Sequence, residues 1–216
     1  INLRVVGDRR LAPPANRKAP AQPNTAQNPA VTPSETEDPR INGDTASQFQ
    51  QKELLDRAYA VLTSLRDENY LTLSSLVHPS KGVTFTPYST VDLDSNITLY
   101  AADLTKARQD TATYTWGLQD GSGELIQMTI TDYFSRYVYN ADFTLAPQLG
   151  INTTLSNGNA LENVEEAYPN AYYIEVFYPG FSPKNEGLDW CGLKLVFEPV
   201  DQTYMLVGIV HSEWTV

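Results

Sequence analysis

Two histidines, His78 and His211, are the first candidates for chemistry, because imidazole changes its charge near neutral pH. A hydrolase triad would need a nucleophile on a strained turn and a carboxylate behind the histidine, and the sequence has no Gly-x-Ser-x-Gly motif. His211 is expected late in a strand, where its neighbour Ser212 faces the opposite side. His78 stands before Pro79 and is expected to end a helix. We therefore expect structural roles for both histidines and assign no catalytic residue.

Four carboxylates near aromatic residues are the other source of acid–base chemistry. They are Asp132, Asp142, Glu175 and Asp189. In a cone-shaped fold, a buried carboxylate among tyrosines could act as a general base, with a tyrosine as the proton donor. The simpler hypothesis, which we favour, is that these are surface carboxylates beside a tyrosine-lined core.

The sequence predicts no metal site and no cofactor. Residues 92–96 begin like a calcium loop, but Ile97 stands where that loop needs glycine and Asp103 where it needs glutamate. We predict a turn with solvated carboxylates there. With a single cysteine, Cys191, the chain can form neither an intramolecular disulfide nor a thiolate metal site, and we expect a buried structural thiol.

Aromatic side chains are the strongest sign of a binding surface, since the chain has 13 tyrosines and three tryptophans. Tyr and Trp combine an apolar ring with a polar tip, which suits contacts with ligands and proteins. They could line a groove that binds a sugar or peptide by stacking, or they could pack in the core. The candidate ligand-binding residues are His78, Tyr88, Trp116, Tyr137, Trp190, His211 and Trp214.

The charge distribution excludes one class of partner. Residues 1–46 hold six basic and five acidic residues, which leaves nine basic and 21 acidic residues, a net charge of −12, for residues 47–216. So acidic a body repels phosphate backbones, and we expect no nucleic-acid binding. No run of about 18 apolar residues occurs, so we expect contact with a membrane only through an anchor upstream of Ile1.

The chain divides into two parts of different composition. Residues 1–46 are rich in Pro, Ala, Asn and Thr, and almost no large apolar residue interrupts the prolines of 11–46. Such a segment cannot bury enough surface to offset its ordering entropy, so we predict an extended linker. Ile1 to Val6 is a short apolar patch, which could end a preceding element or add a strand to the body. Residues 47–216 form one predicted globular domain.

The order of elements in the body predicts an α+β fold. A helix capped by Thr45 or Ser47 should carry apolar residues at helical spacing up to 65. Short strands follow, including a hairpin across Asp120–Gly123, and then a helix over 132–139 capped by Thr131. A final hairpin of 193–197 with 204–211 closes the chain. We predict an N-terminal helix packed on a curved, mainly antiparallel, cone-like sheet.

Three stretches carry a resemblance to a known family. They are His78-Pro-Ser-Lys-Gly-Val-Thr-Phe-Thr-Pro-Tyr88, Tyr114-Thr-Trp-Gly-Leu-Gln-Asp-Gly-Ser-Gly123 and Leu206-Val-Gly-Ile-Val-His-Ser-Glu-Trp-Thr215. Over most of residues 48–216 the chain resembles a family of uncharacterised bacterial exported or lipoprotein-type domains. The resemblance carries over no catalytic residue. It implies a bacterial surface or periplasmic location, with the Pro-rich segment as a tether.

A further analogy concerns the fold alone. The order of elements is similar to that of the nuclear-transport-factor-2-like cone fold, which ketosteroid isomerase and many lipoprotein domains share, and such an analogy fixes no function. We expect a non-enzymatic extracytoplasmic domain that binds a small molecule, a glycan or a protein at the cell envelope. The alternatives are a small cone-fold enzyme with a carboxylate–tyrosine or histidine pair, and a structural envelope module without a ligand.

Overall fold

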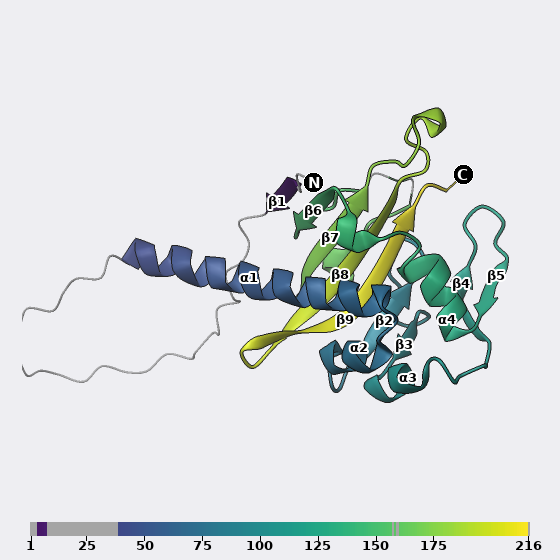
Figure 1. Cartoon of the computed structure of the whole chain (residues 1–216), viewed down its shortest axis with the longest axis horizontal. Coiled ribbons are helices and arrows are strands. Elements are labelled where there is room, and N and C mark those ends of the chain that lie inside the picture. Colours follow the sequence, from purple (N-terminus) through teal and green to yellow (C-terminus); the bar gives the residue numbers. More distant parts are fainter. Residues whose placement is uncertain (1–3, 8–38, 157, 159, 216) are drawn as a thin grey trace, which may run out of the picture.

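The protein has an α+β fold, as the order of elements predicts. The computed structural model describes residues 4–7, 39–156, 158 and 160–215. Helices pack on a mixed, mainly antiparallel sheet of seven strands, and a two-stranded hairpin forms a second, small sheet (Figure 1). Most of the predicted Pro-rich linker, residues 8–38, lies outside the described residues.

The seven-stranded sheet has the order β1-β6-β7-β8-β9-β2-β3. Antiparallel pairing joins β6 through β9 and β2 to β3, whereas β1 is parallel to β6 and β2 is parallel to β9. The long strands β8 and β9 form the predicted final hairpin near the centre of the sheet. The bounds are β1 (Arg4–Gly7), β2 (Val83–Thr86), β3 (Ile97–Leu99), β6 (Gln148–Ile151), β7 (Tyr172–Tyr178), β8 (Cys191–Val200) and β9 (Thr203–Glu213).

The N-terminal apolar patch contributes a strand to the body. Of the two roles that the sequence left open for it, the described part takes the second, because Arg4 to Gly7 pair in parallel with Gln148 to Ile151 at the edge of the sheet. Strand β1 is the edge strand and pairs with β6 on the side opposite to β7. The Val5 side chain remains 52% exposed there. The ladder of backbone hydrogen bonds, rather than burial of Val5, holds β1 in place.

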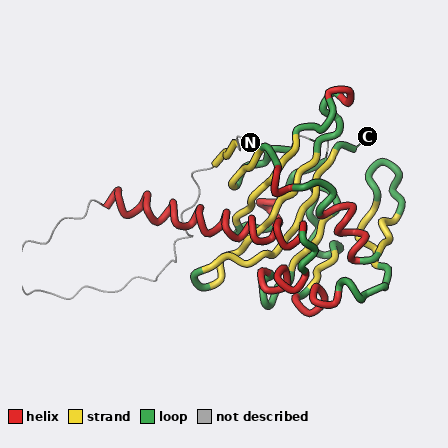
Figure 2. Tube along the Cα trace, viewed as in Figure 1, coloured by secondary structure: helices red, strands yellow, loops and turns green. Residues whose placement is uncertain are grey.

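Helix α1 (Pro39–Arg66) begins earlier than the sequence predicts. The expected caps, Thr45 and Ser47, lie inside the helix, which starts instead at a proline. Proline suits the first turn because the amide hydrogen that it lacks would have no intrahelical partner there. The N-terminal part of α1 runs beyond the sheet, while its C-terminal part lies across the strands (Figures 1 and 2). Among the described residues, no helix is long and apolar enough to span a membrane.

The other helices are short. Asn69 caps α2 by accepting a 3.0 Å hydrogen bond from the Thr72 amide. The helix predicted over 132–139 starts earlier, because Thr129 and not Thr131 accepts the bond from the Asp132 amide. Its second turn is π-helical, over 134–138. The bounds are α2 (Tyr70–Leu76), α3 (Ala101–Lys106), α4 (Ile130–Tyr133), α5 (Val164–Ala167) and the 3-10 turns Phe143–Leu145 and Pro183–Asn185, with the hairpin strands β4 (Tyr114–Leu118) and β5 (Leu125–Met128).

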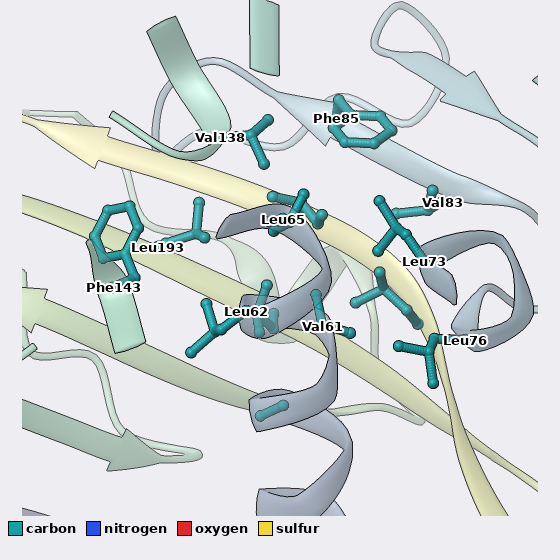
Figure 3. Close-up of a cluster of buried hydrophobic side chains, with 14 of the residues drawn as sticks. Val61, Leu62, Leu65, Leu73, Leu76, Val83, Phe85, Val138, Phe143 and Leu193 are labelled. Atoms are coloured by element: carbon teal, nitrogen blue, oxygen red, sulfur yellow. The ribbon is translucent and has the colours of Figure 1, made fainter. Parts of the chain in front are cut away.

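The main core lies between α1, α2 and one face of the sheet, which we call the inner face. Apolar residues of α1 at helical spacing meet residues of β7, β8 and β9 that recur at every second position. Figure 3 shows several of these side chains converging between the helices and the strands. Fully buried members include Leu54, Val61, Leu73, Phe85, Ile174, Leu193, Leu195 and Leu206.

The opposite, outer face of the sheet is also covered. Residues alternate along a strand, so Tyr173 points away from the inner-face residue Ile174. Tyr173, Val196 and Val210 form a second buried cluster with Val164 and Tyr168, which lie in the segment between β6 and β7. The central strands are therefore buried on both faces over most of their length, and the described residues among 152–171, which we call the covering segment, provide most of the outer cover.

Two leucines of α2 test the assignment of the core. Leu73 is fully buried and Leu71 is 72% exposed in the same helix. We expect Leu73→Ala to lower the free energy of unfolding by about 2–5 kcal/mol, because it removes buried methyl groups and leaves a cavity. Leu71→Ala should change it by less than about 0.5 kcal/mol. Urea unfolding of both variants measures this, and equal losses would contradict the packing of α2.

Candidate functional site

Two groups of polar and aromatic residues lie on opposite faces of the central strands. On the inner face, His211 of β9 meets an aromatic ladder from β4, α4 and the π-helical turn. On the outer face, Lys194 of β8 is surrounded by carboxylates and hydroxyls, and two pockets open beside Tyr168. The two groups differ in what chemistry they allow.

His211 is a buried, neutral histidine. Its Nδ1 atom lies 3.0 Å from the carbonyl oxygen of Pro87, which can only accept, so Nδ1 carries the hydrogen. Nε2 then accepts a hydrogen bond from the Asn140 side chain at 3.2 Å. Burial lowers the pKa of His211, which outweighs the opposing effect of Glu213, 3.9 Å from Nε2. With both ring nitrogens bonded, His211 ties β9 to two loops, in keeping with the structural role that we expected.

The aromatic ladder fills the inner face beside His211. Trp116 stacks on Tyr133 with ring centres 3.9 Å apart, and Tyr133 lies 5.2 Å from Tyr137. The Tyr137 ring meets Tyr88 at 6.0 Å and His211 at 5.6 Å, both edge to face. Burial raises the pKa of Tyr137 well above its usual value, so its hydroxyl stays protonated.

The structure brings together four of the seven predicted binding residues, Tyr88, Trp116, Tyr137 and His211, in this ladder. Trp116 is fully buried, and its Nε1 donates to the carbonyl of Met128. At these positions the side chains pack against one another, with Trp116, Tyr137 and His211 buried and Tyr88 half-buried.

The other three predicted residues lie elsewhere. His78 accepts hydrogen bonds from the amides of Ser80 and Lys81 at Nδ1, so it closes a turn. Its neighbour Val77 pairs in parallel with Leu206, so His78 lies level with Val207, four residues or about 13 Å before His211 along β9. Trp190 packs against Phe177, 5.8 Å between ring centres, and Trp214 is half-buried just after β9. These residues do not share a site.

Lys194 forms a buried ionic centre on the outer face, and sequence reasoning missed it. Its ammonium nitrogen lies 3.2 Å from a Glu175 oxygen and 3.1 Å from a Glu162 oxygen. The hydroxyls of Ser156 and Ser212 lie 3.1 and 3.3 Å away. Lys194 and Glu175 are both fully buried cross-strand neighbours. The only signal in the sequence is a lysine in the middle of the apolar run Leu193 to Phe197, a position where a charge needs a partner.

Glu175 corrects the expectation for the four carboxylates. Asp132 and Asp142 are exposed, as we favoured, but Asp189 is only half-exposed and Glu175 is fully buried. Its carboxylate accepts hydrogen bonds from the backbone amides of Leu155 and Ser156, and it forms an ion pair with Lys194. A buried carboxylate is stable only with such partners, and here the covering segment itself provides two of them.

A glycine lets the covering segment reach this centre. Gly150 of β6 lies opposite Glu175 in the sheet register, and a Cβ atom there would stand 2.4 Å from the Thr153 carbonyl oxygen. The absent side chain allows residues 152–156 to fold back closely over β6. That turn delivers the amides of Leu155 and Ser156 to Glu175.

Two pockets lie on either side of Tyr168, Pro169 and Asn170, which line both. The first has a volume of about 330 Å³, with Val164, Tyr173 and Val196 as buried lining and Asn152 and Glu165 toward solvent. The second has a volume of about 400 Å³ and is lined also by Lys81, Thr84, Leu93, Glu198 and Val207. Burial raises the pKa of Tyr168 to about 12, so its hydroxyl remains a hydrogen-bond donor. Apolar walls with a few polar groups are typical of small-ligand sites.

The neutral state of His211 predicts an acid-sensitive fold. Because the folded-state pKa is lowered, the unfolded chain binds the proton more readily, so this contribution to stability is present above about pH 6.5 and is lost as the pH falls. We expect the free energy of unfolding to fall between about pH 7 and pH 5 more steeply in the wild type than in His211→Gln. Urea unfolding across this range measures it, with His78→Gln as the matched control. Parallel curves for the wild type and His211→Gln would show that His211 is not buried neutral.

Comparison with known proteins yields similarity of fold only. No family model matches the chain, and no curated protein matches it. A solved DUF4783 family protein from Bacteroides ovatus is 8% identical with a TM-score of 0.28, covering 73% of this chain and 94% of that one. A five-substitution variant of Rd1NTF2_05, a designed protein of the nuclear-transport-factor-2-like fold, is 11% identical with a TM-score of 0.30, covering 79% and 98%. The chain is thus similar, at low TM-score, to proteins of that fold.

Proposed function

We propose that this domain binds a neutral glycan at the outer face of the sheet, in the two pockets that share Tyr168, Pro169 and Asn170. The pair of adjacent pockets is the observation that carries the proposal. Each has a volume near the lower end of the range for ligand sites, which suits one small ring per pocket. Two pockets joined by a common wall fit two neighbouring units of a chain.

The chemistry of the walls supports a sugar. Tyr168 and Tyr173 are buried aromatic residues of the lining, and Asn152, Asn170 and Glu165 provide amide and carboxylate groups toward solvent. Sugars present hydroxyl groups and apolar C–H faces together, which such a mixture of groups matches. The net charge of −12 on residues 47–216 disfavours anionic ligands. A neutral glycan is therefore the favoured class.

The inner face supports an enzymatic function less well. In the enzyme alternative, a carboxylate–tyrosine or histidine pair would stand at the floor of a concave cavity. Here the Trp116–Tyr133–Tyr137 ladder fills that region, and His211 has both nitrogens occupied. A binding domain explains the outer pockets, which a purely structural module would not need.

We further propose that the domain works outside the cytoplasm of a bacterium. The resemblance to exported or lipoprotein-type domains supports this location, and the Pro-rich composition of residues 11–46 suits a tether that holds a binding domain away from its anchor. Glycans are abundant partners at the cell envelope, so location and ligand class are consistent with each other.

Asn170 is the sharpest test, because it is exposed and lines both pockets. We expect the wild-type chain to bind neutral oligosaccharides on a glycan array. Asn170→Ala should weaken binding of the best oligosaccharide at least about tenfold in calorimetry, as expected for the loss of hydrogen bonds worth about 1.4 kcal/mol. The melting temperature should stay unchanged.

Gln127→Ala, on the exposed surface of β5, is the matched control and should leave the affinity unchanged. Absence of any binding to neutral glycans would refute the proposed ligand class. Unchanged affinity in Asn170→Ala would place the binding surface away from the pockets.

A further inference from the structure

The buried centre around Lys194 has the components of a self-formed covalent cross-link. We propose that the Lys194 side chain and the Glu162 side chain become joined by an isopeptide bond, with Glu175 as the proton carrier. The three groups come from separate segments: Lys194 from β8, Glu175 from β7 and Glu162 from the covering segment. The inference does not depend on the proposed function.

The geometry places the reacting groups in contact. The Lys194 nitrogen is 3.1 Å from Oε1 of Glu162, so the carboxyl carbon lies one bond beyond a hydrogen-bonding oxygen. The same nitrogen is 3.2 Å from Oε1 of Glu175, so a proton can move directly between them. Reacting atoms held at such distances gain the advantage of an intramolecular reaction.

Glu175 is oriented for this role by the backbone. Its oxygens accept hydrogen bonds from the amides of Leu155 and Ser156, so its carboxylate cannot turn away from Lys194. Ser156 and Ser212 contact the nitrogen from other directions, at 3.1 and 3.3 Å. Four oxygen-bearing groups therefore surround a nitrogen that has at most three hydrogens to donate.

The reaction balances with no other reactant. Glu175 takes a proton from the Lys194 ammonium, and the free electron pair of the nitrogen attacks the carboxyl carbon of Glu162. A carbon–nitrogen bond forms, Glu175 passes its proton to a Glu162 oxygen, and the carbon–oxygen bond breaks. The ammonium loses two hydrogens in all, and they leave with that oxygen as one water molecule.

Burial favours the product. Lys194 and Glu175 are fully buried, and an ion pair without water is costly, whereas an amide is neutral. The Glu162 side chain is 30% exposed, which gives the water a route out of the site. Lys81 and Glu198 form an ion pair at similar range, but Lys81 is 56% exposed, so we expect no reaction there. The difference between the two pairs is the desolvation of Lys194 and the presence of a second carboxylate, Glu175, beside it.

Intact-mass measurement of the purified chain tests the proposal. The cross-linked chain should be lighter than its sequence by about 18 Da, the mass of one water. After trypsin, a fragment of residues 137–184 should be joined to one of residues 185–216, uncleaved at Lys194. A chain of full sequence mass that is cleaved at Lys194 would overturn the proposal, as would a mass loss that maps to other residues.

Three variants assign the roles. Glu162→Gln should still react but lose ammonia, about 17 Da, because the amide nitrogen now leaves. Glu162→Ala, at a partly exposed side chain, should fold and keep its full mass. Glu175→Gln keeps the shape of the buried side chain but cannot carry the proton, and it should also keep its full mass. A loss of about 17 Da in Glu175→Gln in place of Glu162→Gln would overturn the assignment of Glu162 as the acceptor.

Discussion

The burial of the central strands on both faces is the constraint on which the rest of the structure depends. A sheet that is covered on one face only can alternate apolar and polar residues, but β7, β8 and β9 are buried on both faces over most of their length. Every polar residue on them must therefore find a partner inside the protein. His211 finds Pro87 and Asn140 on the inner face, and Lys194 finds Glu175 and Glu162 on the outer face.

The two faces of the sheet are covered by different kinds of structure. The inner face is closed by α1, α2 and the aromatic ladder, which together form the main core. The outer face is closed mainly by the described residues of the covering segment, which include the short helix α5, with Val91 beside them. Irregular backbone leaves hollows that regular helices fill, and the two pockets beside Tyr168 lie along this segment. The proposed binding site therefore lies on the outer face.

The amphipathic part of α1 and the last hairpin could be predicted from the sequence because their signals are local. Apolar residues at helical spacing from Leu54 to Leu65 identify a helix whatever it packs against. The predicted start of α1 was wrong, because the residues before Ser47 are mostly polar and show no helical spacing of apolar residues. Only Pro39 marks the first turn. Local signals also predicted the hairpin across 120–123. For the next helix they predicted Thr131 as the cap, two residues after the actual cap, Thr129.

The candidate sites were harder to predict, because they depend on register. Whether Trp116 lines a groove or packs on Tyr133 is decided by how α4 lies against the hairpin, which no local pattern specifies. Lys194 and Glu175 are 19 positions apart and meet only because β7 and β8 pair in one register; a slip of one residue would put them on opposite faces.

The covering segment takes part in both features of the outer face, the ionic centre around Lys194 and the two pockets beside Tyr168. The stability of this segment and the proposed binding are therefore linked. Leu155, Ser156 and Glu162 are fixed to the sheet by Glu175 and Lys194, while residues between Val164 and Ala171 line the pockets. A segment with little regular structure has few backbone hydrogen bonds of its own, so it needs anchors to keep a defined shape. The ionic centre is such an anchor, placed at the start of the segment, and the buried Tyr168 over Gly208 is another near its end. Between them, the two anchors give a loop the fixed geometry that a binding site requires.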